Sequence, residues 1–125
     1  MKKVIATTSA PAAIGPYSQG IDGGAVVITS GQIPLDPATG AFAAEDVAGQ
    51  TRQCLKNVGA VLAQAGLGME NIIKTTVFLK DMNDFAAMNE VYATFFPGEP
   101  PARSAVEVAR LPKDALVEIE AIAVR

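Results

Sequence analysis

The sequence predicts an α+β fold in which two helices cover one face of a mixed β-sheet. The first observation is that strand-like segments alternate with two amphipathic helical segments along the chain. Elements in this order bury their apolar sides by stacking as two layers. The second observation is that the last strand-like segment is apolar on both faces. The 125 residues hold no repeat, low-complexity segment or linker, so we expect a single domain over residues 1–125.

The amino-terminal half predicts a hairpin, an irregular loop and a helix. Residues 17–30 contain two short segments on either side of an Asp-Gly-Gly turn, which is a hairpin signal. Residues 30–40 carry two prolines and two glycines and predict a shaped loop. Over residues 45–65 apolar side chains recur mostly every three or four residues, and Gly66 follows, which predicts an amphipathic helix.

The carboxy-terminal half predicts a strand, a helix and two strands. Residues 72–79 are rich in Ile, Thr, Val and Phe, which favour strands. A second helix follows, for which Asp81 or Asn83 can serve as the cap, and a proline-rich stretch ends it. The apolar stripe of this helix consists of Phe85, Met88, Tyr92 and Phe95. The strands at 103–110 and 116–124 flank a Leu-Pro-Lys-Asp turn.

The closing strand is apolar on both of its faces. One alternating set of side chains is Val117, Ile119, Ala121 and Ala123, and the other is Leu116, Glu118, Glu120, Ile122 and Val124. The predicted helices cover one face of the sheet only. A largely apolar face without such cover usually packs against a partner subunit. We therefore expect a homo-oligomer.

Composition excludes several kinds of chemistry. Histidine is absent and Cys54 is the single cysteine, so there is no Ser-His or Cys-His pair, no internal disulfide and no histidine or cysteine-cluster metal site. We expect neither metal nor cofactor. A net charge of −3 without a basic run argues against a nucleic-acid partner. The first 15 residues are too polar for a signal peptide or membrane span, so we expect a cytoplasmic protein without a membrane partner.

The charged candidates for a functional site lie in the last two strands. Arg103 starts a strand after a stiff Pro-Pro-Ala segment, and its planar guanidinium can bind a carboxylate through two parallel hydrogen bonds. The alternative is a solvated or structural arginine. Glu118 and Glu120 share one face of a mostly apolar strand, where either could orient a water or act as a base, unless both are ordinary exposed glutamates. Glu107 faces the same choice without a distinguishing signal.

Five further residues give weaker signals. Tyr17 could offer its phenol to a ligand, although a buried tyrosine bonded to backbone is commoner. Ser30 and Gly31 end a strand where the backbone can approach a ligand closely, or simply form a turn. Asn89 belongs to the polar face of the second helix. Cys54 fits a small core residue better than a nucleophile, because no histidine can activate it.

Four segments carry a likeness to a known family, namely IGPYSQG, ITSGQIPLDPATG, IIKTTVFLKDMNDFAAMN and PARSAVEVARLPKDALVEIEAIAV. Together they resemble the Rid (YjgF) family in its imine-deaminase branch, over essentially the whole chain. The resemblance implies a chorismate-mutase-like fold and a homotrimer with three sites in the clefts between subunits. It also implies cofactor-independent hydrolysis of short 2-imino acids, 2-iminopropanoate and 2-iminobutanoate, to 2-oxo acids and ammonia. Pyridoxal-phosphate dehydratases would supply these imines.

The resemblance further implies roles for particular residues. Arg103 would hold the substrate carboxylate and Glu118 would position the hydrolytic water. The implied catalytic residues are Arg103, Glu118 and Tyr17, and the implied substrate-binding residues are Ser30, Gly31, Asn89 and Ala105. Many family members have cysteine in place of Ala105, so only a backbone contact is expected there. The Pro-Gly-Glu-Pro-Pro segment before Arg103 is short for the branch, and we expect an altered pocket rim.

Two other functions stay open. A trimer could bind carboxylates, or act as a chaperone, without catalysis. Some relatives are described as ribonucleases or translation inhibitors, but the net charge of −3 and the lack of histidine weaken that hypothesis. Timing the decay of an imine with and without the protein separates catalysis from binding.

Overall fold

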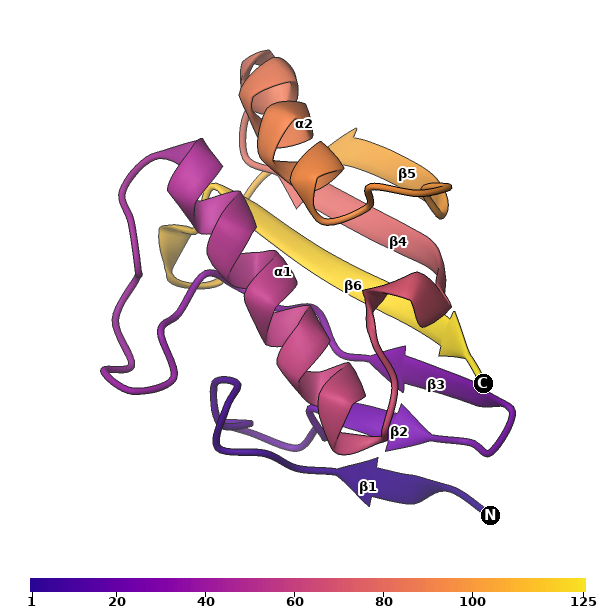
Figure 1. Ribbon diagram of the computed structural model, residues 1–125. Coiled ribbons are helices and arrows are strands. Elements are labelled where there is room, and N and C mark those ends of the chain that lie inside the picture. The colour runs from indigo at the N-terminus through magenta and orange to yellow at the C-terminus, as the bar shows by residue number, and fades with distance from the viewer.

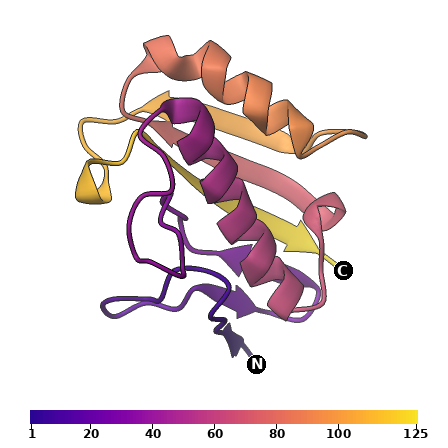
Figure 2. The same cartoon turned by 60° about the vertical axis from the view of Figure 1, so that its left-hand side comes forward.

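The computed structural model describes residues 1–125 and has the predicted α+β architecture, with two helices on one face of a six-stranded mixed sheet (Figures 1 and 2). The strands are β1 (Lys3–Ile5), β2 (Gly20–Asp22), β3 (Val26–Thr29), β4 (Ile72–Leu79), β5 (Ala102–Glu107) and β6 (Val117–Val124). The helices are α1 (Val47–Gln64) and α2 (Phe85–Thr94). The strand order is β1-β2-β3-β6-β4-β5, and only the β4–β5 pair is parallel.

The predicted hairpin is formed by β2 and β3. Its turn is closed by a hydrogen bond of 2.8 Å from the Gly23 amide to the Val26 carbonyl, and Asp22 accepts from the Gly24 amide. Gly24 has a φ of 94°, which a residue with a side chain rarely adopts. The strand β1, which pairs with β2, was not predicted from the sequence. It spans three residues and only Ile5 is buried, so it is too short to show an alternating pattern.

The helix α1 packs its apolar stripe on the sheet and forms the centre of the core. It begins where the Asp46 side chain accepts a hydrogen bond from the Gly49 amide at 3.2 Å, two residues inside the predicted start. Its buried apolar residues are Val47, Cys54, Leu55, Val58, Val61 and Leu62. They contact the helix-facing side chains of β6, namely Val117, Ile119, Ala121 and Ala123. The predicted assignment of those four residues to one buried face is confirmed.

The approach to α2 and the end of β5 are tied together by side-chain hydrogen bonds. Asp81 accepts from the Asn83 amide and caps a short 3₁₀ turn, Met82–Asp84, that leads into α2. The Glu107 carboxylate accepts from the Met82 amide at 2.9 Å, which gives this glutamate a structural role. The strand β5 ends at Glu107 rather than at residue 110, because its partner β4 ends at Leu79.

The face of the sheet opposite the helices is partly apolar and uncovered within the chain. Its exposed apolar side chains are Val26, Ile28, Val106 and Ile122, which alternate with residues directed toward the helices. The predicted second apolar face is therefore confirmed. Neither helix has both the length and the apolar character needed to cross a membrane.

Candidate active site

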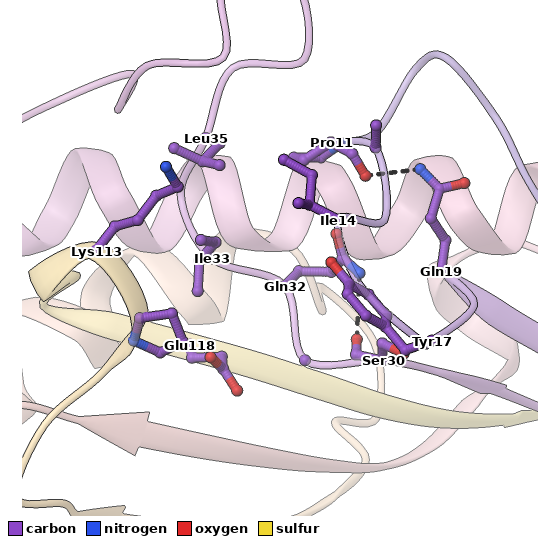
Figure 3. A pocket seen from close by; sticks show the side chains of 13 residues that line it. Pro11, Ile14, Tyr17, Gln19, Ser30, Gln32, Ile33, Leu35, Lys113 and Glu118 are labelled. Carbon is purple, nitrogen blue, oxygen red and sulfur yellow. Dashed lines mark hydrogen bonds between the residues drawn. The ribbon is translucent and has the colours of Figure 1, made fainter.

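The first part of the candidate site is a cavity of about 560 Å³ at the start of β6, called here the Glu118 cavity (Figure 3). Its walls come from the segment after β3, from the loop before β2 and from the turn before β6. Four of the residues singled out in the sequence line it: Tyr17, Ser30, Gly31 and Glu118. The fold thus brings together residues as distant in the sequence as Tyr17 and Glu118.

A change of register after β3 shapes the floor of this cavity. Ile28 pairs with Ile122, and Gln32 pairs with Ile119, so the β3 side has one residue more than β6 across this stretch. Such an extra residue forms a bulge that redirects neighbouring side chains. A Cβ atom on Gly31 would overlap the Glu118 carboxylate and lie 2.9 Å from its Cδ atom. Glycine therefore leaves the space that the Glu118 carboxylate occupies directly over the backbone of residue 31.

The loop that forms the outer wall is held by Gln19. The side-chain amide of Gln19 donates to the carbonyls of Thr7, Ala10 and Pro11, and its oxygen accepts from the Thr7 amide at 2.7 Å. Ser30 closes the other side by donating to the Ser18 carbonyl at 2.6 Å. With the loop fixed in this way, the Tyr17 side chain stays 51% exposed, and no hydrogen bond is made by its hydroxyl.

Glu118 is the residue of this cavity whose pKa is shifted by its surroundings. Burial raises the pKa of its carboxyl, and the neighbouring Glu120 carboxylate raises it further. A carboxylate with a raised pKa is a stronger base than an ordinary glutamate and can take a proton from a bound water. No group of three or more histidine, cysteine, aspartate or glutamate side chains is arranged to hold a metal ion.

The second part of the candidate site is a cavity of about 480 Å³ between α2 and the start of β5, called here the Arg103 cavity. It contains Arg103 and Asn89. An Nη1–H group of Arg103 donates to Asn89 Oδ1 at 2.6 Å. The guanidinium carbon lies 4.8 Å from the ring centre of Tyr92 and 5.3 Å from that of Phe85. These contacts place the cation against two aromatic rings.

Arg103 has no carboxylate partner in the chain. The two salt bridges of the protein join Arg110 to Asp114 and Arg125 to Asp22. Because its side chain makes a single hydrogen bond, the remaining guanidinium N–H groups are free to bind an external anion. A half-buried arginine with aromatic support and unused donors suits a planar carboxylate.

The two cavities are separate within one chain. Arg103 lies on the helix-covered face of the sheet, where it contacts α2. Glu118 alternates along β6 with the residues that face the helices, so its side chain lies on the opposite face of the sheet. Ala105 lines neither of these cavities, since its side chain packs against the core beside Val77. The seven residues singled out in the sequence therefore form two groups and one outlying position.

The structure also decides three of the alternatives left by the sequence. Tyr17 is not a core tyrosine bonded to backbone, because half of its surface is exposed. Asn89 does more than provide a polar surface, since it orients Arg103. Cys54 is fully buried, and burial raises the pKa of its thiol well above the usual value, so it is a core residue.

Other residues of the site were not found from the sequence. Gln19 and Gln32 line the Glu118 cavity and Tyr92 lines the Arg103 cavity, but the sequence marks the glutamines in no way and marks Tyr92 only as part of an apolar stripe. Their roles depend on contacts between distant segments, such as that of Gln19 with Pro11 (Figure 3).

Comparisons with known proteins identify the family of this chain. A family model described as Endoribonuclease L-PSP matches residues 7–125. A 2-iminobutanoate/2-iminopropanoate deaminase of Salmonella typhimurium is 63% identical over 128 aligned residues, which cover 100% of this chain and 99% of that protein. The crystal structure of Escherichia coli TdcF with bound serine is 57% identical, with a TM-score of 0.95 and 98% of each chain covered.

A further solved structure, YyfA of Yersinia pestis from the conserved Rid protein family, is 52% identical with a TM-score of 0.97, and the match covers 100% of both chains. The likeness noted in the four sequence segments therefore extends to the whole fold. On these grounds the chain belongs to the Rid (YjgF) family, whose family model carries the description Endoribonuclease L-PSP.

Proposed function

We propose that this protein is a deaminase that hydrolyses short 2-imino acids, such as 2-iminopropanoate and 2-iminobutanoate, to 2-oxo acids and ammonia. The observation that carries the proposal is the pair of complementary groups in the two cavities. One cavity holds a cation with free N–H donors, and the other holds a carboxylate with a raised pKa. The full-length likeness to 2-iminobutanoate/2-iminopropanoate deaminases supports it.

The chemistry needs no group beyond these side chains and water. Arg103 binds the substrate carboxylate through two parallel N–H···O bonds. Glu118 accepts a proton from water as the water oxygen bonds to the imine carbon, and the C=N electron pair moves to nitrogen. With a protonated imine as substrate, this addition gives a carbinolamine with an –NH2 group, to which Glu118 returns the proton. The C–N bond then breaks and ammonia leaves with that bond's electron pair, while the carbinol oxygen forms the C=O bond of the 2-oxo acid and its hydroxyl proton passes to Glu118 or water.

The proposal includes an assembly in which one subunit supplies the Glu118 cavity and its neighbour supplies the Arg103 cavity. A homotrimer with three intersubunit sites would join the two groups that lie apart within one chain. The apolar side chains Val26, Ile28, Val106 and Ile122 on the uncovered face support such packing. Tyr17, Ser30, Gly31 and Asn89 would then surround the substrate, with a backbone contact from Ala105.

The size of the substrate follows from the relatives. Escherichia coli TdcF binds serine, which has the three-carbon skeleton and carboxylate of 2-iminopropanoate. The imines would arise from pyridoxal-phosphate dehydratases acting on serine or threonine, and a cytoplasmic location stays a prediction. A ribonuclease activity is disfavoured by the net charge of −3 and by the lack of histidine.

The test is a coupled assay in which a dehydratase generates the imine and the appearance of 2-oxo acid is timed. We expect the protein to shorten the life of the imine, with the same rate after exhaustive chelation of divalent ions. Titration of 2-oxobutanoate, a product, into the protein measures binding in parallel. If 2-oxobutanoate binds but the life of the imine is unchanged, the protein is a carboxylate-binding module and the proposal is wrong.

A further inference from the structure

The guanidinium of Arg103 rests on an aromatic residue that is itself fixed by a buried hydrogen bond. The Tyr92 hydroxyl lies 2.6 Å from Thr75 Oγ1. Thr75 is fully buried and Tyr92 is 5% exposed. A hydrogen bond made in such surroundings is costly to lose, since each unpaired polar group would remain away from water.

The three residues come from three elements that the fold brings into register. Thr75 on β4 pairs directly with Arg103 on β5, and Tyr92 projects from α2 above both. The Tyr92 ring also contacts Phe96, with the ring centres 4.8 Å apart and the ring planes tilted by 42°. The ring is thus held at its hydroxyl end by Thr75 and along its side by Phe96.

The Arg103 guanidinium lies over this ring, with its central carbon 4.8 Å from the ring centre. A planar guanidinium is attracted to an aromatic face and can stack on it, so a fixed ring restricts the positions that the cation can take. Asn89 restricts the guanidinium further by accepting from one Nη1–H group. Burial raises the pKa of the Tyr92 phenol, so the ring stays neutral and its hydroxyl stays available to Thr75.

We propose that Tyr92, held by Thr75, is a positioning residue that fixes the plane of the Arg103 guanidinium for carboxylate binding. Tyr92 does not itself bind the substrate. This inference rests on the proposed role of Arg103 as the carboxylate-binding group.

Two variants separate the ring from its hydrogen bond. In Tyr92→Leu the nearer of the two aromatic rings is removed while Phe85 stays, and we expect the Kd for 2-oxobutanoate to rise about 3- to 30-fold. In the double variant Thr75→Val/Tyr92→Phe both partners become apolar groups of similar shape, so stability stays close to that of the parent. The ring at residue 92 is no longer held by a hydrogen bond in this variant, and we expect the Kd for 2-oxobutanoate to rise about 2- to 5-fold.

The matched control is Val58→Ala, which loses buried volume in α1 away from Arg103 and lowers stability without changing the Kd. A second readout is independent of substrate. Side-chain ¹⁵N NMR of Arg103, assigned with Arg103→Lys, should show restricted rotation of the guanidinium in the parent and in Val58→Ala. The same signals should be averaged by rotation in Tyr92→Leu.

The outcomes distinguish this inference from the proposed function. If the parent neither binds 2-oxobutanoate nor hydrolyses imines, the proposed function fails, while the NMR readout still tests whether Tyr92 orders Arg103. Unchanged Arg103 signals in Tyr92→Leu overturn the inference. If Tyr92→Leu does not fold, the double variant decides, because a parent-like Kd in the folded double variant would show that the Thr75–Tyr92 bond does not position Arg103 and would overturn the inference.

Discussion

The two cavities of the candidate site are built in different ways. In the Arg103 cavity the functional group is held by other side chains, through the hydrogen bond to Asn89 and the rings of Tyr92 and Phe85. In the Glu118 cavity the shape comes mainly from backbone, through a bulge and a loop bonded to Gln19. The cation is therefore oriented before a ligand arrives.

The Glu118 cavity, in contrast, is left open on one side. Ile14 is 82% exposed and Tyr17 is 51% exposed, although both line it. Large apolar side chains at the mouth of a cavity indicate a surface that becomes covered in the working assembly. One half of the site thus holds a cation fixed by side chains, whereas the other half is open, and in the proposed assembly the neighbouring subunit would complete it. The following predictions test that division, from the largest effect to the smallest.

Removal of the oriented cation should abolish the activity. We expect Arg103→Ala to lower imine hydrolysis by roughly 100-fold or more, since two charge-assisted hydrogen bonds are lost. Arg103→Lys should recover little, because a point charge cannot form the parallel pair of bonds. The coupled assay with equal amounts of folded protein measures this. Near-normal activity in either variant would remove Arg103 from the mechanism.

Neutralising the carboxylate of the other cavity should separate binding from turnover. In Glu118→Gln the shape stays but the base is lost, so turnover should fall by about 100- to 10,000-fold while 2-oxobutanoate still binds. Glu120→Gln, on the same strand face, is the control and should have a milder effect. If Glu120→Gln were the inactive variant, the water-positioning role would belong to Glu120.

Displacing the same carboxylate without removing it should give a smaller loss. A Cβ atom at residue 31 overlaps the flexible end of the Glu118 side chain, so Gly31→Ala should move the carboxylate and lower turnover by about 10- to 100-fold. Thermal unfolding should change little, because no backbone atom has to shift. Gly59→Ala on α1, whose added Cβ meets only Met69 Sδ at 3.4 Å, should leave activity unchanged.

Mixing two inactive variants tests whether the cavities belong to different subunits. If Arg103→Ala and Glu118→Gln are unfolded, mixed in equal amounts and refolded, random assembly should restore about a quarter of the sites. That fraction of the parent activity should return, and it should not return when either variant is refolded alone. If the mixture stays inactive, Arg103 and Glu118 of each site come from the same chain. The separation of the two cavities within one chain argues against that arrangement.

The pH dependence should show the smallest change. Because burial and then Glu120 raise the pKa of Glu118, the acidic limb of the rate profile should lie above that of an ordinary glutamate. Glu120→Gln removes the smaller cause, so the limb should move to lower pH. A carboxyl whose pKa is raised in the native state stabilises the fold at low pH, and this contribution to stability is lost as the pH rises through the native pKa. The free energy of unfolding of Glu118→Gln, measured relative to that of the parent, should therefore be higher at pH 7 than at pH 4.

Much of the fold could be predicted from the sequence because its elements have strong local signals. The hairpin turn at residues 22–24, the stripe of α1 and the two-faced strand β6 were all recognised, whereas β1 was missed because a three-residue edge strand has no readable period. The membership of the site residues was suggested by the family resemblance. The division of these residues into two cavities could not be predicted from the sequence. Alternation along β5 or β6 shows which residues of one strand share a face of the sheet. It does not show which face the helices cover, so the positions of Arg103 and Glu118 relative to the helices stayed undetermined.

One buried residue provides a way to follow all of these variants. Cys54 is fully buried between α1 and β6, where its thiol donates to the Val117 carbonyl at 3.5 Å. Since burial holds the thiol protonated, it can react with an alkylating reagent only when that interface opens. Because Cys54 is the sole cysteine of the chain, its rate of alkylation measures how often the native state opens in each variant.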